Sequence, residues 1–237
     1  MAATLYLIPV ALGDAPWPTY LPQASRDLAC ALRHFAVENA KSARAELKRL
    51  EHPLPLRELA IEQLPEKPSA ADIERLLAPL RAGHDLGVMS EAGCPGVADP
   101  GALLVRRAHE MGITVRPLVG PSSLLLALMA SGLDGQRFAF HGYLPAREPE
   151  RGRRIAELER ESQQGSQTQL FIETPYRNAA LFDALLAACR PRTLLCVASD
   201  LSLPTETVRT RSVADWRQAQ RPDLDRRPTV FLLLSAG

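Results

Sequence analysis

Two short segments combine glycine, serine and other small residues in a way that suits ligand binding by the main chain. The segment SEAGCPGVADPG begins with Ser90 to Gly93, and the segment VGPSS contains Ser122 and Ser123. Small residues let a backbone approach a ligand closely, and hydroxyl and N–H groups at a helix start bind polar or anionic groups. A structural tight turn and plain helix capping remain the alternatives. Their spacing, with one helix and one strand between them, favours a shared ligand site.

Two further side chains of the first segment have simpler explanations. Asp99 precedes Pro100 and an amphipathic stretch that ends at Gly112, so the pattern predicts an N-cap followed by proline at the first helical position. Cys94 has no histidine or other base that the sequence places beside it. We therefore interpret Cys94 as a small buried side chain rather than a nucleophile.

Acid–base candidates occur in the loops but are not distinguished by their context. Glu91, Glu173, Asp14 and His141 follow predicted strands or lie near their ends. A hydroxyl nucleophile would benefit from a nearby base, whereas a ring carbon or nitrogen does not require one. The sequence does not separate a base from a cap or a solvated acid here, so the catalytic residue stays unknown.

Several common sites are absent from the sequence. No G-x-G-x-x-G follows the first predicted strand, and no G-x-x-x-x-G-K-[ST] or G-x-S-x-G motif occurs. The cysteines at 30, 94, 189 and 196 lack metal or redox spacing, so no metal site is expected and reduced thiols in a cytoplasmic protein are the default. No apolar run approaches a membrane span, and MAATLYLIPV alternates like a strand rather than a signal peptide.

The elements that must position these segments alternate between strand and helix. Apolar, β-branched stretches predict strands at 4–10, 34–38, 85–90, 113–119, 138–143, 168–174, 193–199, 206–210 and 229–235. Helical patterns lie between most of them, for example in ADIERLLAPLRAG, which stops at Gly83. Alternation of this kind predicts α/β domains with a largely parallel sheet covered on both faces.

The pattern loosens after about residue 120, which indicates two halves. We predict an N-terminal α/β domain with a parallel sheet over 1–117 and a C-terminal α/β domain with a mixed sheet over 118–237. The chain has 237 residues, of which 46% are hydrophobic and 23% charged, which is enough to form two small domains with buried cores. A net charge of +1 gives no global field for nucleic acid or a membrane surface.

Four stretches match a known family in order along most of the chain. TLYLIPVALGD, the block from Ser90 to Leu133, FAFHGYLPA and LFIETPYRN resemble the tetrapyrrole methylase superfamily. Within it, they look most like the branch that methylates a ribose 2′-hydroxyl of small-subunit ribosomal RNA. The resemblance implies two α/β domains, a homodimer, and S-adenosylmethionine in the cleft between the domains.

The same resemblance implies a set of cofactor-binding residues. Pro9 would end the first strand beside the cofactor, and the loop from Ser90 would lie under its methionine and ribose parts. Ser122 and Ser123 match a polar pair at a helix start, Glu173 closes the sixth strand, and Pro228 with Thr229 would flank the adenine. The implied set is Pro9, Ser90, Glu91, Ala92, Gly93, Val97, Ser122, Ser123, Glu173, Pro228 and Thr229.

The chain departs from the RNA-methylating branch where the substrate is concerned. Glu38 and the positive charge of Lys41 remain, but Asn39 and Ala40 replace an aspartate and a threonine. Thr174-Pro175-Tyr176-Arg177 stands where that branch has Ser-Pro-His-Arg, and residues 199–203 lose two basic residues. The helical C-terminal extension of that branch is also missing. The chain resembles a shorter sister group whose methyl acceptor is open.

Three functions remain open from the sequence. The leading one is a methyltransferase acting on RNA, with arginines near the predicted cleft mouth contacting phosphates. These arginines could equally form a solvated mixed-charge loop with Glu148 and Glu150. The second is a methyltransferase for a small tetrapyrrole-like metabolite, and the third a non-catalytic cofactor-binding module. The arginines are Arg147, Arg151, Arg153, Arg154 and Arg177.

Overall fold

The chain forms two compact units in a computed structural model that describes residues 3–235. The first unit is Met1–Ser122 and the second is Ser123–Gly237, so the division falls a few residues after position 117. Each unit contains one five-stranded sheet. Among the described residues, no helix is both long and apolar enough to cross a membrane.

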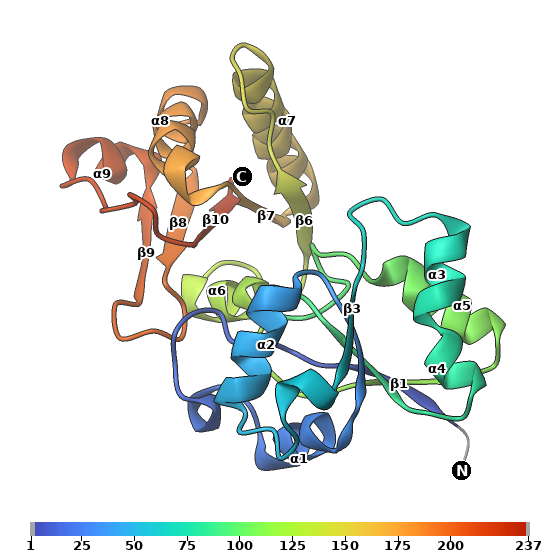
Figure 1. Cartoon of the computed structure of the whole chain (residues 1–237). Helices are drawn as coiled ribbons and strands as arrows, with labels where there is room; N and C mark the ends of the chain where they lie inside the picture. Colours follow the sequence, from blue (N-terminus) through green and yellow to red (C-terminus); the bar gives the residue numbers. More distant parts are fainter. Residues whose placement is uncertain (1–2, 236–237) are drawn as a thin grey trace. The chain divides into compact units, whose positions relative to one another are not determined.

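The first unit is built on a parallel sheet with the strand order β3-β2-β4-β1-β5. Helices α1 and α2 lie on one side of this sheet and α3, α4 and α5 on the other (Figure 1). The second of these faces buries a continuous apolar cluster that includes Leu5, Leu86 and Leu104. The strands are β1 (Thr4–Leu7), β2 (His34–Val37), β3 (Ala60–Gln63), β4 (Leu86–Met89) and β5 (Thr114–Pro117), and the helices are α1 (Gln23–Ala31), α2 (Ala40–Arg49), α3 (Ala70–Leu76), α4 (Ala78–Arg81) and α5 (Ala102–Glu110), with short 3₁₀ turns at Trp17–Thr19 and Leu56–Glu58.

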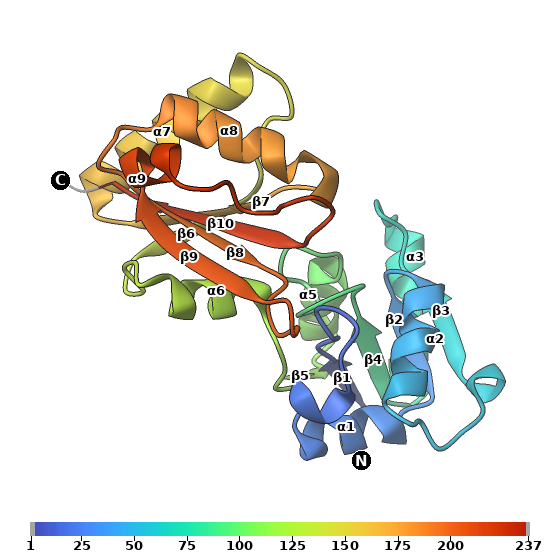
Figure 2. The ribbon, with the colours of Figure 1, turned by 90° about the vertical axis from the view of Figure 1, so that its left-hand side faces the viewer.

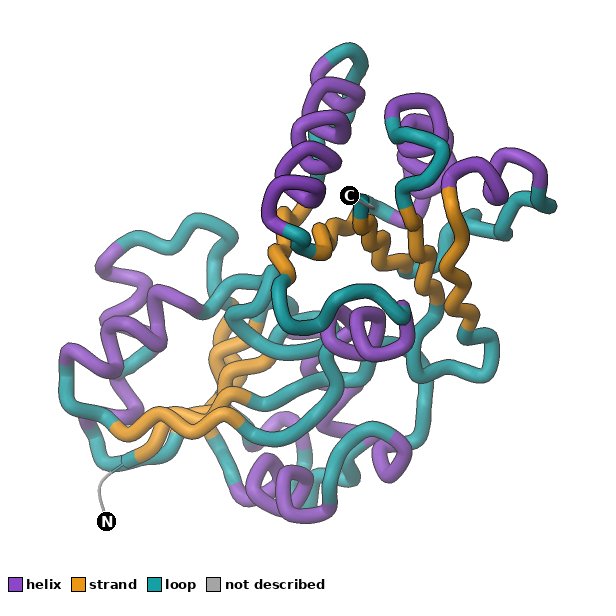
Figure 3. The backbone as a smooth tube through the Cα atoms, turned by 180° about the vertical axis from the view of Figure 1, so that it is seen from behind, coloured by secondary structure: helices purple, strands orange, loops and turns teal. Residues whose placement is uncertain are grey.

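The second unit has a mixed sheet with the order β6-β7-β10-β8-β9, in which the neighbours β6 and β7 pair parallel and the other neighbouring strands pair antiparallel. Helices α7, α8 and α9 cover one face and α6 covers the other (Figures 2 and 3). Phe171, Phe182, Trp216 and Phe231 belong to the buried cluster under α7, α8 and α9. The elements are α6 (Ser123–Ser131), β6 (Phe138–Tyr143), α7 (Glu150–Gly165), β7 (Thr168–Ile172), a 3₁₀ turn (Pro175–Arg177), α8 (Asn178–Ala188), β8 (Leu194–Ser199), β9 (Thr207–Ser212), α9 (Val213–Gln218) and β10 (Thr229–Leu234).

The predicted α/β class, with a parallel sheet followed by a mixed one, is confirmed. The structure adds β3, which the sequence analysis missed because its four residues are largely exposed and follow no apolar run. The helix expected over ADIERLLAPLRAG is divided at Leu77 into α3 and α4, because Pro79 cannot donate a backbone hydrogen bond within one continuous helix.

The predicted N-cap role of Asp99 is wrong. Helix α5 begins at Ala102, and its N-cap is Gly101, with φ of 135° and no side-chain cap bond. That backbone conformation is open to glycine and strained for other residues, so Gly101 sets the helix start two positions after the aspartate. The Asp99 side chain is therefore available for another role.

Candidate functional site

The loops after β1 and β4 are tied together at the carboxyl end of the first sheet. Val10 N donates to Gly93 O over 2.8 Å, and Gly93 N donates to Val10 O over 3.0 Å. Since β1 and β4 are neighbours in the sheet, this bridge continues their pairing into the loops. Pro9 and the loop from Ser90 to Gly93 are thus brought together, as ligand-binding loops of parallel sheets usually are.

The loop after β5 packs against the same place. A Cβ built on Gly120 would lie 2.4 Å from Pro9 Cβ, a distance that only glycine avoids. Cys94 Sγ donates to Pro121 O over 3.3 Å, and burial raises the pKa of its thiol. Cys94 therefore acts as a packed, protonated side chain, as interpreted from the sequence, although it is half-buried rather than buried.

The loop from Ser90 combines a fixed backbone with exposed small side chains. Ser90 is buried and its hydroxyl donates to Ala92 O over 3.1 Å, while Glu91 N donates to Glu38 Oε2 over 2.9 Å. Gly93 has φ of +71°. Ala92 is exposed, as is Val97, at 49%. This is a preformed stretch of main chain that little side-chain bulk covers.

Asp99 lies near the carboxylates of Glu38 and Glu91. Burial, followed by the negative charge of Glu38, raises the pKa of Asp99 to about 6. A carboxyl with such a pKa exchanges a proton close to neutral pH. The sequence analysis missed this residue as a proton-transfer candidate because the Asp-Pro pair before a helix has the same pattern as an ordinary cap.

Glu46 anchors the loop after β1 from inside α2. Its side chain is 1% exposed; Oε1 accepts from Tyr20 Oη at 2.5 Å and from Ala11 N at 3.4 Å, and Oε2 pairs with Arg49. Arg49 also reaches Asp14 over 3.0 Å. Burial and then the bond to Glu46 raise the pKa of Tyr20. The sequence signal was present, since Glu46 shares the buried face of α2 with Ala43 and Leu47.

A second cluster of polar residues lies in the second unit, at the edge of the sheet where several strands begin or end. β7 and β8 end at this edge and the antiparallel β10 begins there, with Thr229 opposite Ser199 and Val230 opposite Ile172. The buried Glu173 carboxylate accepts from Arg177 Nη2 at 2.8 Å and from Thr174 N at 2.6 Å. Glu173, Pro228 and Thr229 are therefore brought to the same edge.

The rest of this edge is a connected hydrogen-bond network with open positions. The hydroxyls of Thr229 and Ser199 are 2.8 Å apart, and Arg227 O accepts from Thr229 Oγ1 at 3.0 Å and from Asn178 Nδ2 at 2.7 Å. Two buried atoms have no hydrogen-bond partner within residues 3–235, Asn178 Oδ1 and Arg177 Nε. Buried polar groups normally have partners, so these two atoms are the open positions of the network.

Within residues 3–235, the side chains of the remaining predicted residues form no hydrogen bond with the networks described above. Ser123 begins α6 and Ser122 precedes it, and both are half-buried. His141 lies on β6, where its Nε2 is 2.5 Å from Gln169 Oε1. In the part of the chain that the structure describes, no group of three or more His, Cys, Asp or Glu side chains could hold a metal ion.

Most of the arginines predicted to contact phosphate are neutralised by acids. Arg151 pairs with Glu148 at 3.0 Å, and Arg154 pairs with Glu157 and Glu161 at 3.1 and 2.9 Å. Arg177 pairs with Glu173, as described above. Arg147 and Arg153 are exposed. This charge distribution favours the solvated mixed-charge alternative for the start of α7.

The departures from the RNA-methylating branch have structural roles here. Asn39 is the N-cap of α2, and its Oδ1 accepts from Lys41 N at 2.9 Å and Ser42 N at 3.4 Å. Asp200 has φ of 52° and accepts from Arg227 Nε and Thr205 Oγ1, both at 2.8 Å. These side chains stabilise the two turns in which the branch carries other residues.

Comparison with known proteins identifies the family. A sequence model of the tetrapyrrole (corrin/porphyrin) methylases matches residues 19–216. The chain belongs to this family. The resemblance to the tetrapyrrole methylases that the sequence motifs indicated is thereby confirmed.

Curated members of the tetrapyrrole methylase family that resemble the chain are named ribosomal RNA small subunit methyltransferase I. The protein from Xylella fastidiosa (strain Temecula1) is 35% identical over 164 residues, which cover 69% of this chain and 59% of that protein. The protein from Pseudomonas aeruginosa is 29% identical over 239 residues, covering 100% of this chain and 79% of that protein. The chain thus matches little more than half the length of the Xylella protein.

Solved tetrapyrrole methylase structures share the fold. The methyltransferase CobJ superposes with a TM-score of 0.63 at 17% identity, covering 99% of this chain and 94% of CobJ. The cobalt precorrin-4 methyltransferase CbiF gives a TM-score of 0.62 at 15% identity, covering 98% and 94%. The parallel and mixed sheets described above are the shared architecture.

Proposed function

We propose that this chain is an S-adenosylmethionine-dependent methyltransferase that acts on RNA, with a ribose 2′-hydroxyl of ribosomal RNA as its acceptor. The observation that carries the proposal is family membership together with relatives at 35% identity that are named for methylation of small-subunit ribosomal RNA. With such a substrate, we also propose a cytoplasmic location.

The residues present fit S-adenosylmethionine. In the first unit, the loop that contains Ser90, Glu91, Ala92, Gly93 and Val97 has a fixed shape, in which Glu91, Ala92 and Val97 are exposed. When bound, the cofactor supplies an electrophilic methyl group on a sulfonium centre. Main-chain groups and a nearby carboxylate suit the zwitterionic methionine part of such a ligand.

In the second unit, the polar edge suits the nucleoside part. Asn178 Oδ1 is a buried acceptor and Arg177 Nε a buried donor without partners in the described chain. A nucleobase that both donates and accepts hydrogen bonds would satisfy such atoms. We propose that Glu173, Pro228 and Thr229 bind this part, and that Pro9, Ser122 and Ser123 complete the set.

Asp99 is the residue that we propose for proton transfer. A ribose hydroxyl loses its proton when its oxygen is methylated, and a carboxylate oxygen of Asp99 would accept that proton. Its pKa of about 6 keeps most of the carboxyl ionised at pH 7 and leaves it basic enough to assist. Burial is the main cause of this raised pKa, and the negative charge of Glu38 adds to it.

A homodimer is part of the proposal. Helix α6 is apolar on all sides, and Leu125 and Met129 are 53% and 80% exposed, one helical turn apart. Exposed apolar patches of this kind mark interaction sites. We propose that this stripe of α6 faces a second copy of the chain.

A methylation screen tests the function. Ribosomal RNA from cells with and without the protein is digested, and its nucleosides are compared by mass spectrometry. We expect one 2′-O-methylnucleoside to be lost without the protein and restored by the wild-type chain, but not by Asp99→Asn. Unchanged nucleosides in both samples would contradict the RNA acceptor.

A small corrin- or porphyrin-like acceptor is the second candidate, because CobJ and CbiF share the fold across nearly the whole chain. Labelled methyl transfer into extracts freed of nucleic acid would identify this activity. Cofactor binding without transfer to either class of acceptor would instead indicate a binding module.

A further inference from the structure

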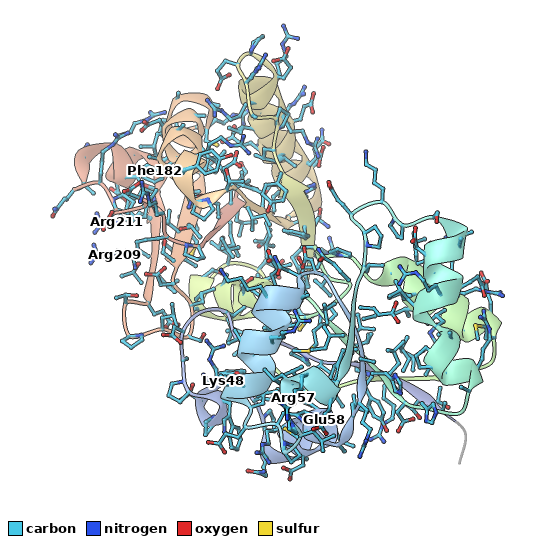
Figure 4. The ribbon with its side chains drawn as sticks, in the orientation of Figure 1. Lys48, Arg57, Glu58, Phe182, Arg209 and Arg211 are labelled. Atoms are coloured by element: carbon cyan, nitrogen blue, oxygen red, sulfur yellow. The ribbon has the colours of Figure 1, made fainter. Side chains whose placement is uncertain are left out.

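The outer strand of the second sheet carries two arginines on one face. Arg209 and Arg211 alternate along β9, where they lie opposite Val197 and Leu195 of β8. Strand β9 is the last strand of its sheet, so no further strand covers it on the outer side. Both side chains point outward from β9 (Figure 4). Arg209 is exposed and Arg211 half-buried.

Neither arginine has an acidic partner within residues 3–235. No carboxylate of this part of the chain lies within ion-pair distance of either guanidinium, in contrast to Arg151 and Arg154 of α7. Unpaired arginines keep their full charge for a ligand, whereas paired arginines must first give up a partner.

Acids near β9 are engaged elsewhere. Asp215 accepts from Ser212 at the start of α9, and Glu206 accepts from Ser202 N over 2.7 Å. Asp223 accepts from Asp225 N over 3.3 Å. The neighbouring Arg221 pairs with Asp183, and Arg227 pairs with Asp200. These three acids keep their negative charge but are held by neutral donors, which leaves the guanidinium groups of Arg209 and Arg211 without an ion-pair partner in the described chain.

Aromatic packing and a hollow give this surface a defined shape. The Arg211 guanidinium lies 5.2 Å from the centre of the Trp216 ring, whose Nε1 donates to Leu195 O over 2.8 Å. Stacking on a buried ring orients the planar guanidinium. Beside it, a pocket of about 250 Å³ is lined by polar and charged side chains that include Arg209, Gln220, Arg221 and the acidic Asp223. The surface thus presents oriented donors around a recess.

We infer that the outer face of β9, defined by Arg209 and Arg211, binds the sugar–phosphate backbone of the RNA acceptor. The inference rests on the proposed RNA methyltransferase function and adds the surface that holds the substrate. The guanidinium fork matches two phosphate oxygens at once, and phosphate contacts position RNA without reading its sequence. Phosphate contact is the role that the sequence analysis gave to a different set of arginines, namely Arg147, Arg151, Arg153, Arg154 and Arg177.

Fluorescence anisotropy with a labelled fragment of small-subunit ribosomal RNA tests the inference. Arg209→Gln with Arg211→Gln should weaken binding roughly ten-fold or more and lower the slope of log K against log salt by about 1.4, for two phosphate contacts on single-stranded RNA. Arg209→Lys with Arg211→Lys keeps both charges and should retain most of the slope. A matched control, Arg75→Gln with Arg107→Gln, removes two acid-paired arginines from the first unit and should leave the slope unchanged.

The outcomes separate this inference from the proposed function. A wild-type chain that binds the RNA with a steep salt dependence, while the β9 glutamine variant binds with the same affinity and slope, overturns the inference and leaves the function intact. A wild-type chain that does not bind the RNA contradicts the RNA acceptor itself. A glutamine variant that loses a dimer rather than RNA affinity would assign β9 to a second copy and would also overturn the inference. S-adenosylmethionine binding, measured in parallel, should be unchanged in the variant and shows that it is folded.

Discussion

Asp99 illustrates how a backbone detail decides the role of a side chain. The conformation of Gly101 delays the start of α5, and the aspartate that the sequence assigns to capping instead lies near Ser90 and Glu38. Sequence patterns could predict the loop from Ser90 to Gly93 because glycine and small residues are visible in the chain. They could not predict the pKa of Asp99, which depends on burial and on charges from distant positions.

The raised pKa of Asp99 predicts a pH-dependent cost to stability. Its ordinary value of 3.8 applies to the unfolded chain, and the folded value is about 6, so between these values the folded state binds more protons and the free energy of unfolding falls as pH rises. Asp99→Asn removes this decline. We expect it to raise the free energy of unfolding at pH 7 by about 1 kcal/mol, after discounting the shift for partial exposure, as measured by urea denaturation from pH 4 to 7.

The same substitution should remove methyl transfer to RNA. If Asp99 accepts the hydroxyl proton, the wild-type rate should increase with pH up to about pH 6 and level off above it. A stable Asp99→Asn variant with wild-type rates at all pH values would show that another group takes the proton.

Gly93 tests the shape of the cofactor loop. Gly93→Ala places a side chain at φ of +71°, which costs about 1 kcal/mol of stability. Gly83→Ala is a matched control, since Gly83 has φ of +83° and no atom within 4 Å of its added Cβ. Both variants should lose similar stability in urea denaturation. Only Gly93→Ala should weaken S-adenosylmethionine binding, roughly ten-fold by calorimetry, and equal effects on binding would argue against this loop as the site.

At the scale of elements, strands β1, β4, β7, β8 and β10 could be predicted because each is a largely buried and mostly apolar run. Strand β3 and the break between α3 and α4 could not, since an exposed edge strand lacks such a run and a proline can occur in the first turn of a helix as well as interrupt one. Helix α2 shows a further limit. Its hydrophobic face is visible in the sequence, but the contact of Glu46 with the loop after β1 follows only from the packing of the two.

Glu46 should hold α2 and the loop after β1 together. Glu46→Ala leaves the Tyr20 hydroxyl and Ala11 N–H without their acceptor and separates Arg49 from a buried partner. We expect a loss of about 3 kcal/mol in the free energy of unfolding. Glu46→Gln keeps the acceptor oxygen and should lose roughly half as much. Urea denaturation of both variants measures this, and a Glu46→Ala loss below that of Glu46→Gln would contradict it.

At the scale of the whole molecule, the sequence predicted the order of helices and strands. It also predicted that a parallel sheet is followed by a mixed sheet. The order follows from local patterns, and the family resemblance follows from motifs that retain their sequence order. The surface on β9 could not be predicted, because the pairing state of each arginine depends on which acids the fold brings near it.

The proposed dimer belongs to this scale. Leu125→Glu with Met129→Glu places two charges on the exposed stripe of α6, and burying them in an interface would be costly. We expect light scattering after size exclusion to show the wild-type chain as a dimer and this variant as a monomer. Arg106→Glu, an exposed change on α5, should leave the dimer intact. A wild-type monomer at all concentrations would contradict the proposal.

Titration calorimetry with S-adenosylmethionine tests the account most directly, using one variant in each unit. The wild-type chain should bind one cofactor per chain, and both Gly93→Ala in the first unit and Thr229→Val in the second should weaken that binding. Thr229→Val is similar in size but cannot complete the hydroxyl network with Ser199. Saturable binding that both variants weaken is the predicted result. The absence of any binding heat in the wild-type chain, or equal affinity in all three proteins, would contradict the account.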